Sequence, residues 1–172
     1  DCSSRGLGDV YKRQVLMRYL KIIFSLILIN LLDKEIAGIT NAYFTIFPLT
    51  FLSYSFYVYK SNSNFGSSEA FFIGLFIDLI SDSFLGLNAI FFCLITYLIN
   101  IYANAFKLFS YLQICIFFGL SSSAYVGLSQ MIINIWNFSY VTLFMSTILN
   151  IILCILMAIL SAYLPNFVKG RL

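Results

Sequence analysis

The residues best placed to carry chemistry are Gly74, Asp78 and Asp82, which recur every four residues and so share one face of a helix. Asp78 is embedded in the apolar stretch LFIDLI, and an aspartate at the centre of a membrane helix costs roughly 2.5–3.5 kcal/mol on insertion scales. It therefore needs a partner, either a hydroxyl or amide of this chain or a group on another protein, and the sequence leaves both open. Asp82 lies near the segment end, where we expect it to reach water or to cap the following turn.

Small residues form a second candidate surface. Gly119, Ser123 and Gly127 are also spaced by four, and small residues at this spacing let helices approach closely in lipid, where packing drives association. The pattern is typical of packing within one chain, and a subunit interface is the alternative. Gly86 is predicted to allow a tight turn between two helices.

Residues that support catalysis or metal binding are scarce. The chain has no histidine, which removes the commonest general base and the commonest metal ligand. Its four cysteines stand singly, without a C-x-x-C pair, so neither a disulfide framework nor a zinc site is predicted. The basic residues form no run or stripe that could follow nucleic-acid phosphates. We therefore expect no enzyme activity, no cofactor, no metal and no nucleic-acid partner.

The composition indicates a membrane protein. Hydrophobic residues make up 61% of the 172 residues and charged residues only 10%, whereas a soluble domain carries about 25% charged residues. A bilayer span needs about 20 apolar residues, so the length allows five to seven helices and leaves no room for a separate soluble domain. The predicted fold is an all-α, polytopic transmembrane helical bundle with six spans, forming one domain over residues 15–172.

Residues 1–14, DCSSRGLGDVYKRQ, differ from the rest of the chain. They are polar, lack apolar periodicity and end in a string that resembles translated sequencing-adapter sequence. We interpret them as an adapter-derived artefact or a disordered tail, set them aside from the fold, and expect the natural start at Met17. A genuine cytoplasmic tail is the alternative.

Charges and turn signals divide the remainder into helices. The triplet Asp33-Lys34-Glu35 is predicted to end the first helix in water, and Pro48 to kink the second. The 61 uncharged residues between Lys107 and Lys169 are more than one helix can use, so a turn is placed at residues 134–140. The six predicted spans are residues 19–32, 40–58, 70–81, 85–105, 108–133 and 142–164.

The distribution of basic residues predicts the orientation. With six spans and a cytoplasmic N-terminus, only Lys34 falls outside and both termini are cytoplasmic. The basic residues predicted to lie inside are Arg18, Lys21, Lys60, Lys107, Lys169 and Arg171. Residues 70–105 form either two spans or a re-entrant pair that does not cross fully, and the charge bias is the same in both cases.

Residues 74–98, GLFIDLISDSFLGLNAIFFCLITYL, resemble the bacterial rod shape-determining protein family MreD. That family has a glycine-leucine-x-x-aspartate helix, a short break, a leucine-glycine-leucine turn and an apolar helix ending near tyrosine. The resemblance extends from Met17 to the end of the chain, and Asn88 departs from it where a histidine is more usual. The matching residues are Gly74, Leu75, Asp78, Leu85, Gly86, Leu87 and Tyr97.

The resemblance implies a non-enzymatic scaffold of the cell-elongation machinery in the bacterial inner membrane. The implied partners are an MreC-like membrane protein and, indirectly, the actin-like MreB filament and the glycosyltransferase and transpeptidase of peptidoglycan synthesis. It also implies a fold similar to the substrate-binding subunits (S-components) of energy-coupling-factor vitamin transporters.

Such a transporter subunit is the alternative function. Those subunits carry an alanine-x-x-x-alanine-type face in the first helix, whereas residues 22–32 here, IIFSLILINLL, contain no alanine. An intramembrane enzyme is a third alternative, for which Asp78 lacks a second catalytic group. Co-purified proteins or a bound vitamin would distinguish the first two.

Overall fold

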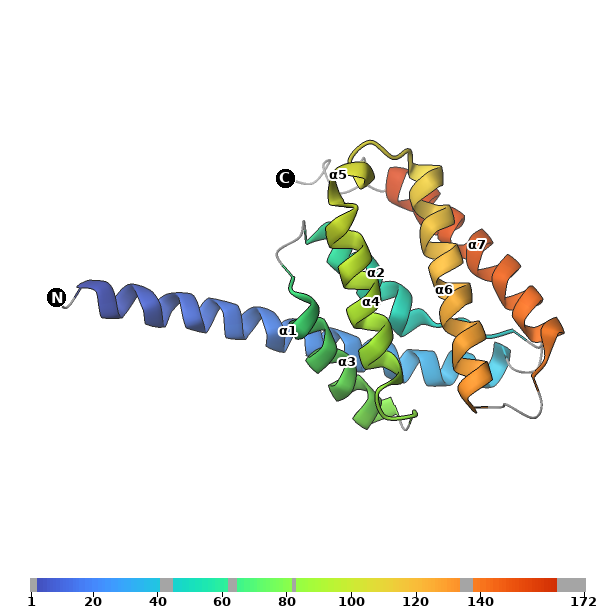
Figure 1. The fold of residues 1–172 in the computed structure, drawn as a ribbon, viewed down its shortest axis with the longest axis horizontal. Coiled ribbons are helices and arrows are strands. Elements are labelled where there is room, and N and C mark those ends of the chain that lie inside the picture. The colour runs from blue at the N-terminus through green and yellow to red at the C-terminus, as the bar shows by residue number, and fades with distance from the viewer. Residues whose placement is uncertain (1–2, 41–44, 62–64, 82, 134–137, 164–172) are drawn as a thin grey trace.

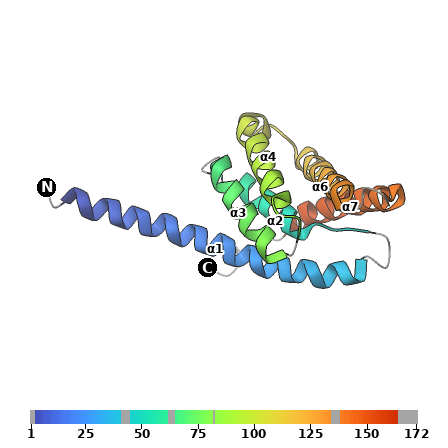
Figure 2. The ribbon, with the colours of Figure 1, turned by 60° about the horizontal axis from the view of Figure 1, so that its bottom comes forward.

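The computed structural model of the chain describes residues 3–40, 45–61, 65–81, 83–133 and 138–163. These residues form an all-α fold, as predicted. In Figure 1, α3 lies beside α4 and α6 beside α7, and the N-terminal part of α1 projects away from the other helices; Figure 2 shows the same arrangement after a rotation. The helices in the described residues are α1 (Ser3–Thr40), α2 (Leu49–Lys60), α3 (Ser67–Ser81), α4 (Leu87–Ile101), α5 (Ala103–Phe106), α6 (Tyr111–Ile133) and α7 (Tyr140–Tyr163).

The first helix is longer than its predicted span. α1 passes through Asp33, Lys34 and Glu35 without a break, so the prediction that this triplet ends the helix is wrong. None of the three is a helix breaker, and the side chains of Lys34 and Glu35 are exposed while Asp33 is half-buried. α1 also includes residues 3–14, and their adapter origin stays a prediction.

The second helix begins later than predicted. Residues 45–48 are not helical, and α2 starts at Leu49, directly after Pro48. Proline has no N–H to donate and is well accepted where a helix begins. Pro48 therefore precedes α2, and the predicted kink inside a span over residues 40–58 is wrong. Residues 41–44 lie outside the described part of the chain.

α3 and α4 form a hairpin close to the predicted third and fourth helices. α4 ends at Ile101 and the short α5 follows it, where one helix over residues 85–105 was predicted. α3 and α4 have 15 residues each, which gives a length of about 22 Å, against a bilayer core of roughly 30 Å. Both alternatives for this hairpin, two spans or a re-entrant pair, stay predictions.

α6 and α7 lie close to the last two predicted spans. Within the described residues, one helix is long and apolar enough to cross a membrane by length and composition, at Leu112–Ile133. The apolar stretches Leu87–Ile101 and Tyr140–Leu156 are shorter. The fold is thus a bundle of one long and several shorter apolar helices, and the number of complete spans stays a prediction. Residues 134–137 of the predicted turn lie outside the described residues.

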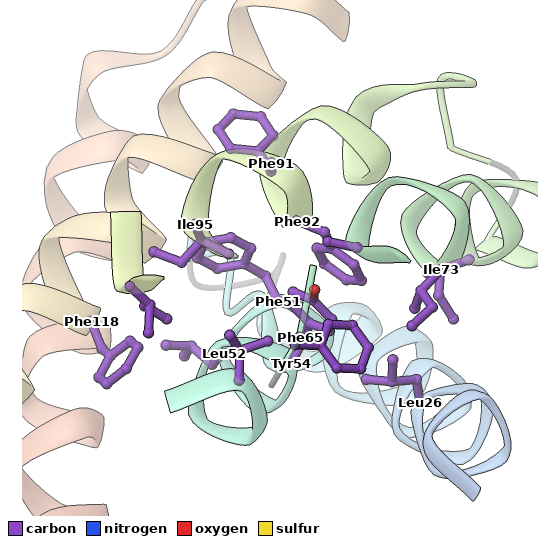
Figure 3. Packing of buried hydrophobic residues seen from close by; sticks show 14 of the residues in the cluster. Leu26, Phe51, Leu52, Tyr54, Phe65, Ile73, Phe91, Phe92, Ile95 and Phe118 are labelled. Atoms are coloured by element: carbon purple, nitrogen blue, oxygen red, sulfur yellow. The ribbon is translucent and has the colours of Figure 1, made fainter. Parts of the chain in front are cut away.

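An aromatic core joins α2 to its neighbours (Figure 3). The ring of Tyr54 on α2 stacks on Phe92 of α4 with centroids 3.9 Å apart, and its hydroxyl shares a 2.8 Å hydrogen bond with Thr96. Leu26 from α1 and Phe118 from α6 lie on opposite sides of this cluster. Because packing holds helices together in lipid, the core fixes α2 against α4 and so sets the position of the hairpin.

Candidate functional site

The carboxylate of Asp78 caps the N-terminus of the next helix. Asp78 is only 2% exposed. Its carboxylate oxygens accept hydrogen bonds from the backbone N–H groups of Gly86, Asn88 and Ala89, at 2.9, 3.0 and 3.2 Å. Ser83 Oγ and Asn88 Nδ2 donate two more, at 2.8 and 2.9 Å. The first N–H groups of a helix have no partner within it and lie at its positive dipole end. Asp78 on α3 therefore supplies the side-chain cap that Gly86, at the N-cap of α4, does not provide.

These bonds use the whole carboxylate. An ionised carboxylate offers about four lone-pair sites, and the donors described above all belong to this chain. Of the two kinds of partner that the sequence left open for Asp78, the structure shows the internal one.

Two glycines allow this close arrangement. A Cβ on Gly74 would lie 2.6 Å from the backbone nitrogen of Ala89 and closer still to its Cα, so α3 and α4 touch backbone to backbone one turn from Asp78. Gly86 has a φ of +99°, a left-handed conformation that side-chain-bearing residues rarely adopt. The turn predicted at Gly86 is present, and it points the first N–H groups of α4 at the carboxylate.

Asn88 extends the cap to two further helices. Its Oδ1 accepts a 2.8 Å hydrogen bond from the hydroxyl of Tyr125 on α6. The Tyr125 ring stacks on Phe51 of α2, with centroids 4.9 Å apart and an interplanar angle of 15°. A neutral imidazole also offers one donor and one acceptor, so the histidine that is more usual at this position in the resembling family suits the same two bonds. One polar chain thus connects α3, α4 and α6.

A second cap was missed by the sequence reasoning. Asp33 on α1 accepts hydrogen bonds from the backbone N–H groups of Leu49 and Thr50, at 3.3 and 3.1 Å, and from the Thr50 hydroxyl at 2.8 Å. In the structure α2 has Pro48 at its N-cap and no local side-chain cap, although helices usually begin with Ser, Thr, Asp or Asn. No sequence signal pointed to this remote cap, because the start of α2 at Leu49 was not predicted.

The two caps flank a pocket of about 310 Å³ whose lining is mainly apolar and includes several polar side chains. It lies where the C-terminal part of α1, the segment before α2, the α3–α4 turn and the end of α6 meet. Asp33, Asn88 and Tyr125 line it, together with Asn30 and Gln130. Within the described residues no group of three or more His, Cys, Asp or Glu could hold a metal ion, so the lining offers neutral hydrogen-bonding groups beside one carboxylate and one ammonium group.

The second set of small residues lies between α6 and α7. A Cβ on Gly119 would lie 2.8 Å from the Ile151 side chain, and one on Gly127 2.9 Å from Leu143. Ser123 donates to the Gly119 and Leu120 carbonyl groups of its own helix. The two glycines thus face another helix of the same chain, and any role for the set in a subunit interface stays a prediction. Asp82 lies outside the described residues.

Comparison with known proteins gives one family. A family model described as rod shape-determining protein MreD matches residues 14–164. No curated protein and no solved structure matches the chain, so the expected similarity to transporter subunits stays a prediction. The matched residues contain α2 to α7 and most of α1, and with them both caps. Because the match covers 151 of the 172 residues, the chain belongs to the MreD family of non-enzymatic, rod shape-determining membrane proteins.

Proposed function

We propose that this protein is a scaffold of the cell-elongation machinery in the bacterial inner membrane. It binds an MreC-like membrane protein and thereby couples the MreB filament to the elongation glycosyltransferase and transpeptidase that build peptidoglycan. It has six spans and both termini in the cytoplasm. The family's role in rod-shape determination supports this proposal, and the basic residues support the orientation.

The main support for the proposal is that the Asp78 carboxylate is bonded within the chain. This carboxylate is the buried charged group within an apolar helix, and the five hydrogen bonds that it accepts come from the chain itself. A general acid or base needs a free proton-transfer position beside a substrate, and Asp78 has its oxygens committed to α4. The polar chemistry at Asp78 therefore holds the fold, and recognition falls to the outer faces of the helices.

The face that best suits a partner helix lies between α1 and α3. A groove of about 380 Å³ there is lined by Tyr19 and Ile23 of α1 and by Phe72 and Phe76 of α3. Beside it, α1 exposes an apolar stripe with helical spacing at Leu20, Phe24, Leu28 and Leu31. Individual interhelical contacts in lipid are modest, about 0.6 kcal/mol for an average hydrogen bond, so we expect recognition to be spread over this face.

Depletion in a rod-shaped host tests the function. Loss of the protein should round the cells and leave vitamin uptake intact, because the scaffold has no transported substrate. Cells that keep their shape and lose uptake of one small molecule would instead favour the transporter-subunit alternative.

Co-purification tests the partner and the face. The MreC-like protein and the elongation synthases should co-purify with the chain from native-like membranes. Phe72→Ala should weaken this association, whereas Phe144→Ala, the same change at a comparably exposed position on α7, should not. Equal effects of the two changes would count against the α1–α3 face.

A further inference from the structure

The pocket between the two caps contains acceptor atoms that have no partner within the described part of the chain. Asn30 on α1 is only 6% exposed, and its Oδ1 has no hydrogen-bond partner among the described residues. The Oε1 atom of Gln130 on α6 is also buried and has no partner there. Both side chains line the pocket. Buried polar atoms without partners are rare in native proteins because they forfeit the hydrogen bonds that they make with water.

The other polar groups of the pocket are engaged with partners of their own, and Lys34 Nζ donates to the Ile80 carbonyl at 3.3 Å. Asn88 and Tyr125 are bonded to each other, and Asn88 also donates to Asp78. The Asp33 carboxylate is an acceptor itself and already receives the N–H groups of α2. The two unpartnered atoms, on Asn30 and Gln130, are acceptors, so a group that satisfies them must bring hydrogen-bond donors.

We propose that this pocket binds a small polar group carrying hydroxyl or ammonium donors, which it holds through Asn30, Gln130 and Asp33. The volume of about 310 Å³ lies at the lower end of the range for small-molecule sites. Asp33 and Lys34 are the charged residues among those lining it, so its formal charge is balanced and the ligand is selected by its donors rather than by its net charge. The inference does not depend on the scaffold function.

The depth of the pocket fits a lipid headgroup. It lies at the end of the bundle where Asp33, Lys34 and Glu35 follow the apolar part of α1, and charged residues at the end of an apolar helix are expected at headgroup level in either orientation of the chain. Ethanolamine and glycerol headgroups carry the required donors. A soluble molecule with the same donors is the second source of this chemistry.

Lipid nanodiscs of defined composition test the proposal on the full chain. Phosphatidylcholine is the matched control for phosphatidylethanolamine, because its quaternary ammonium has the same charge and no N–H donor. The midpoint temperature of unfolding and the lipid retained in native mass spectrometry should both be higher with phosphatidylethanolamine or phosphatidylglycerol than with phosphatidylcholine. Soluble glycerophosphoethanolamine, added to phosphatidylcholine nanodiscs, tests the second source.

Variants tie the effect to the pocket. Asn30→Leu and, separately, Gln130→Leu should each weaken binding of the donor-bearing headgroup about tenfold, the loss expected for one buried hydrogen bond. Asn100→Leu is the control, because Asn100 also has a buried unpartnered Oδ1 but does not line this pocket. Using two variants keeps the test decisive if one of them does not fold.

Selective retention of a donor-bearing lipid that is lost in the Asn30 and Gln130 variants supports the proposal with a lipid source. Stabilisation by glycerophosphoethanolamine alone, lost in the same variants, supports it with a soluble source. The proposal is overturned if none of these probes acts, or if they act equally on both variants and on wild type, since the pocket then holds water only.

Discussion

The hydroxyl of Tyr125 lies 2.8 Å from Oδ1 of Asn88, and this bond connects α6 to the residue that also donates to Asp78. The Tyr125 ring is held separately by stacking on Phe51. Tyr125→Phe removes the bond and keeps the stack, so it should lower the free energy of unfolding by about 1 kcal/mol. Thermal unfolding in nanodiscs measures this change.

Two substitutions of Asn88 test the same hydrogen bond. Asn88→His keeps one donor and one acceptor and should stay close to wild type. Asn88→Leu removes the side-chain bonds to both Asp78 and Tyr125 and keeps only the backbone bond to Asp78, so it should be clearly destabilised. Equal stability of the two variants would show that the polar chain between α3 and α6 contributes little.

Asp78→Ala should be among the most damaging single changes in the chain. It leaves the N–H groups of Gly86, Asn88 and Ala89 without their acceptor, and loss of a helix cap alone costs about 0.5–2 kcal/mol. Asp78→Asn keeps one acceptor oxygen and should recover part of the loss. Asp82→Ala is the comparison, and cell shape and thermal unfolding are the measurements. Equal and mild effects of both alanine changes would remove Asp78 from the site.

Gly74→Ala tests the backbone contact between α3 and α4. The added Cβ overlaps the backbone of Ala89, and overpacking of this kind costs about 1–3 kcal/mol. The control is Gly38→Ala on α1, where a Cβ meets nothing within 4 Å and the higher helix propensity of alanine should stabilise by up to about 1 kcal/mol. The two changes should thus shift the unfolding midpoint in opposite directions, and shifts of the same sign would contradict the close contact.

Asp33→Ala should destabilise more than Glu35→Ala. The two carboxylates are two residues apart on α1, but Asp33 accepts the N–H groups of α2 while Glu35 is exposed. The expected loss for Asp33 is about 0.5–2 kcal/mol, against little change for Glu35. Denaturation of both variants in the same detergent measures the difference, and a larger loss for Glu35 would show that the cap is unimportant.

Reporter fusions test the orientation. A reporter that needs the cytoplasm should be active after Leu172, and one that needs the periplasm should be active near Asn137. A periplasmic C-terminus would mean an odd number of crossings, so one of the six assigned spans would be wrong.

Helix positions could be predicted wherever apolar runs ended in polar breaks, as at Ser81 for α3 and near residue 133 for α6. The prediction failed at Asp33 and Pro48, where local signals point the wrong way. Charged residues do not break a helix when their side chains reach water or a partner, and a proline at a helix start costs no hydrogen bond. What no local pattern encodes is the bonding of Asp33 to the first N–H groups of α2, because it depends on α1 and α2 lying together.

The sequence was enough to identify several residues of the candidate site, but not the contacts that these residues make. The spacing of Gly74 and Asp78 placed them on one helix face, and the turn at Gly86 followed from its type. Asp78 accepts hydrogen bonds from three backbone N–H groups because of the way α3 packs against α4, and the sequence does not show this packing. Asn30 and Gln130 gave no signal in the sequence, because each is a single amide in an apolar helix and only the pocket brings them together.

Because two helices are capped by a side chain of the preceding helix, the caps have a consequence for how the chain enters the bilayer. α2 and α4 each begin with N–H groups whose acceptor lies on the preceding helix, Asp33 for α2 and Asp78 for α4. Without that acceptor, these N–H groups would be left to water at the membrane surface. The start of each of these helices is thus completed only when the preceding helix is in place, which favours insertion in pairs, α1 with α2 and α3 with α4.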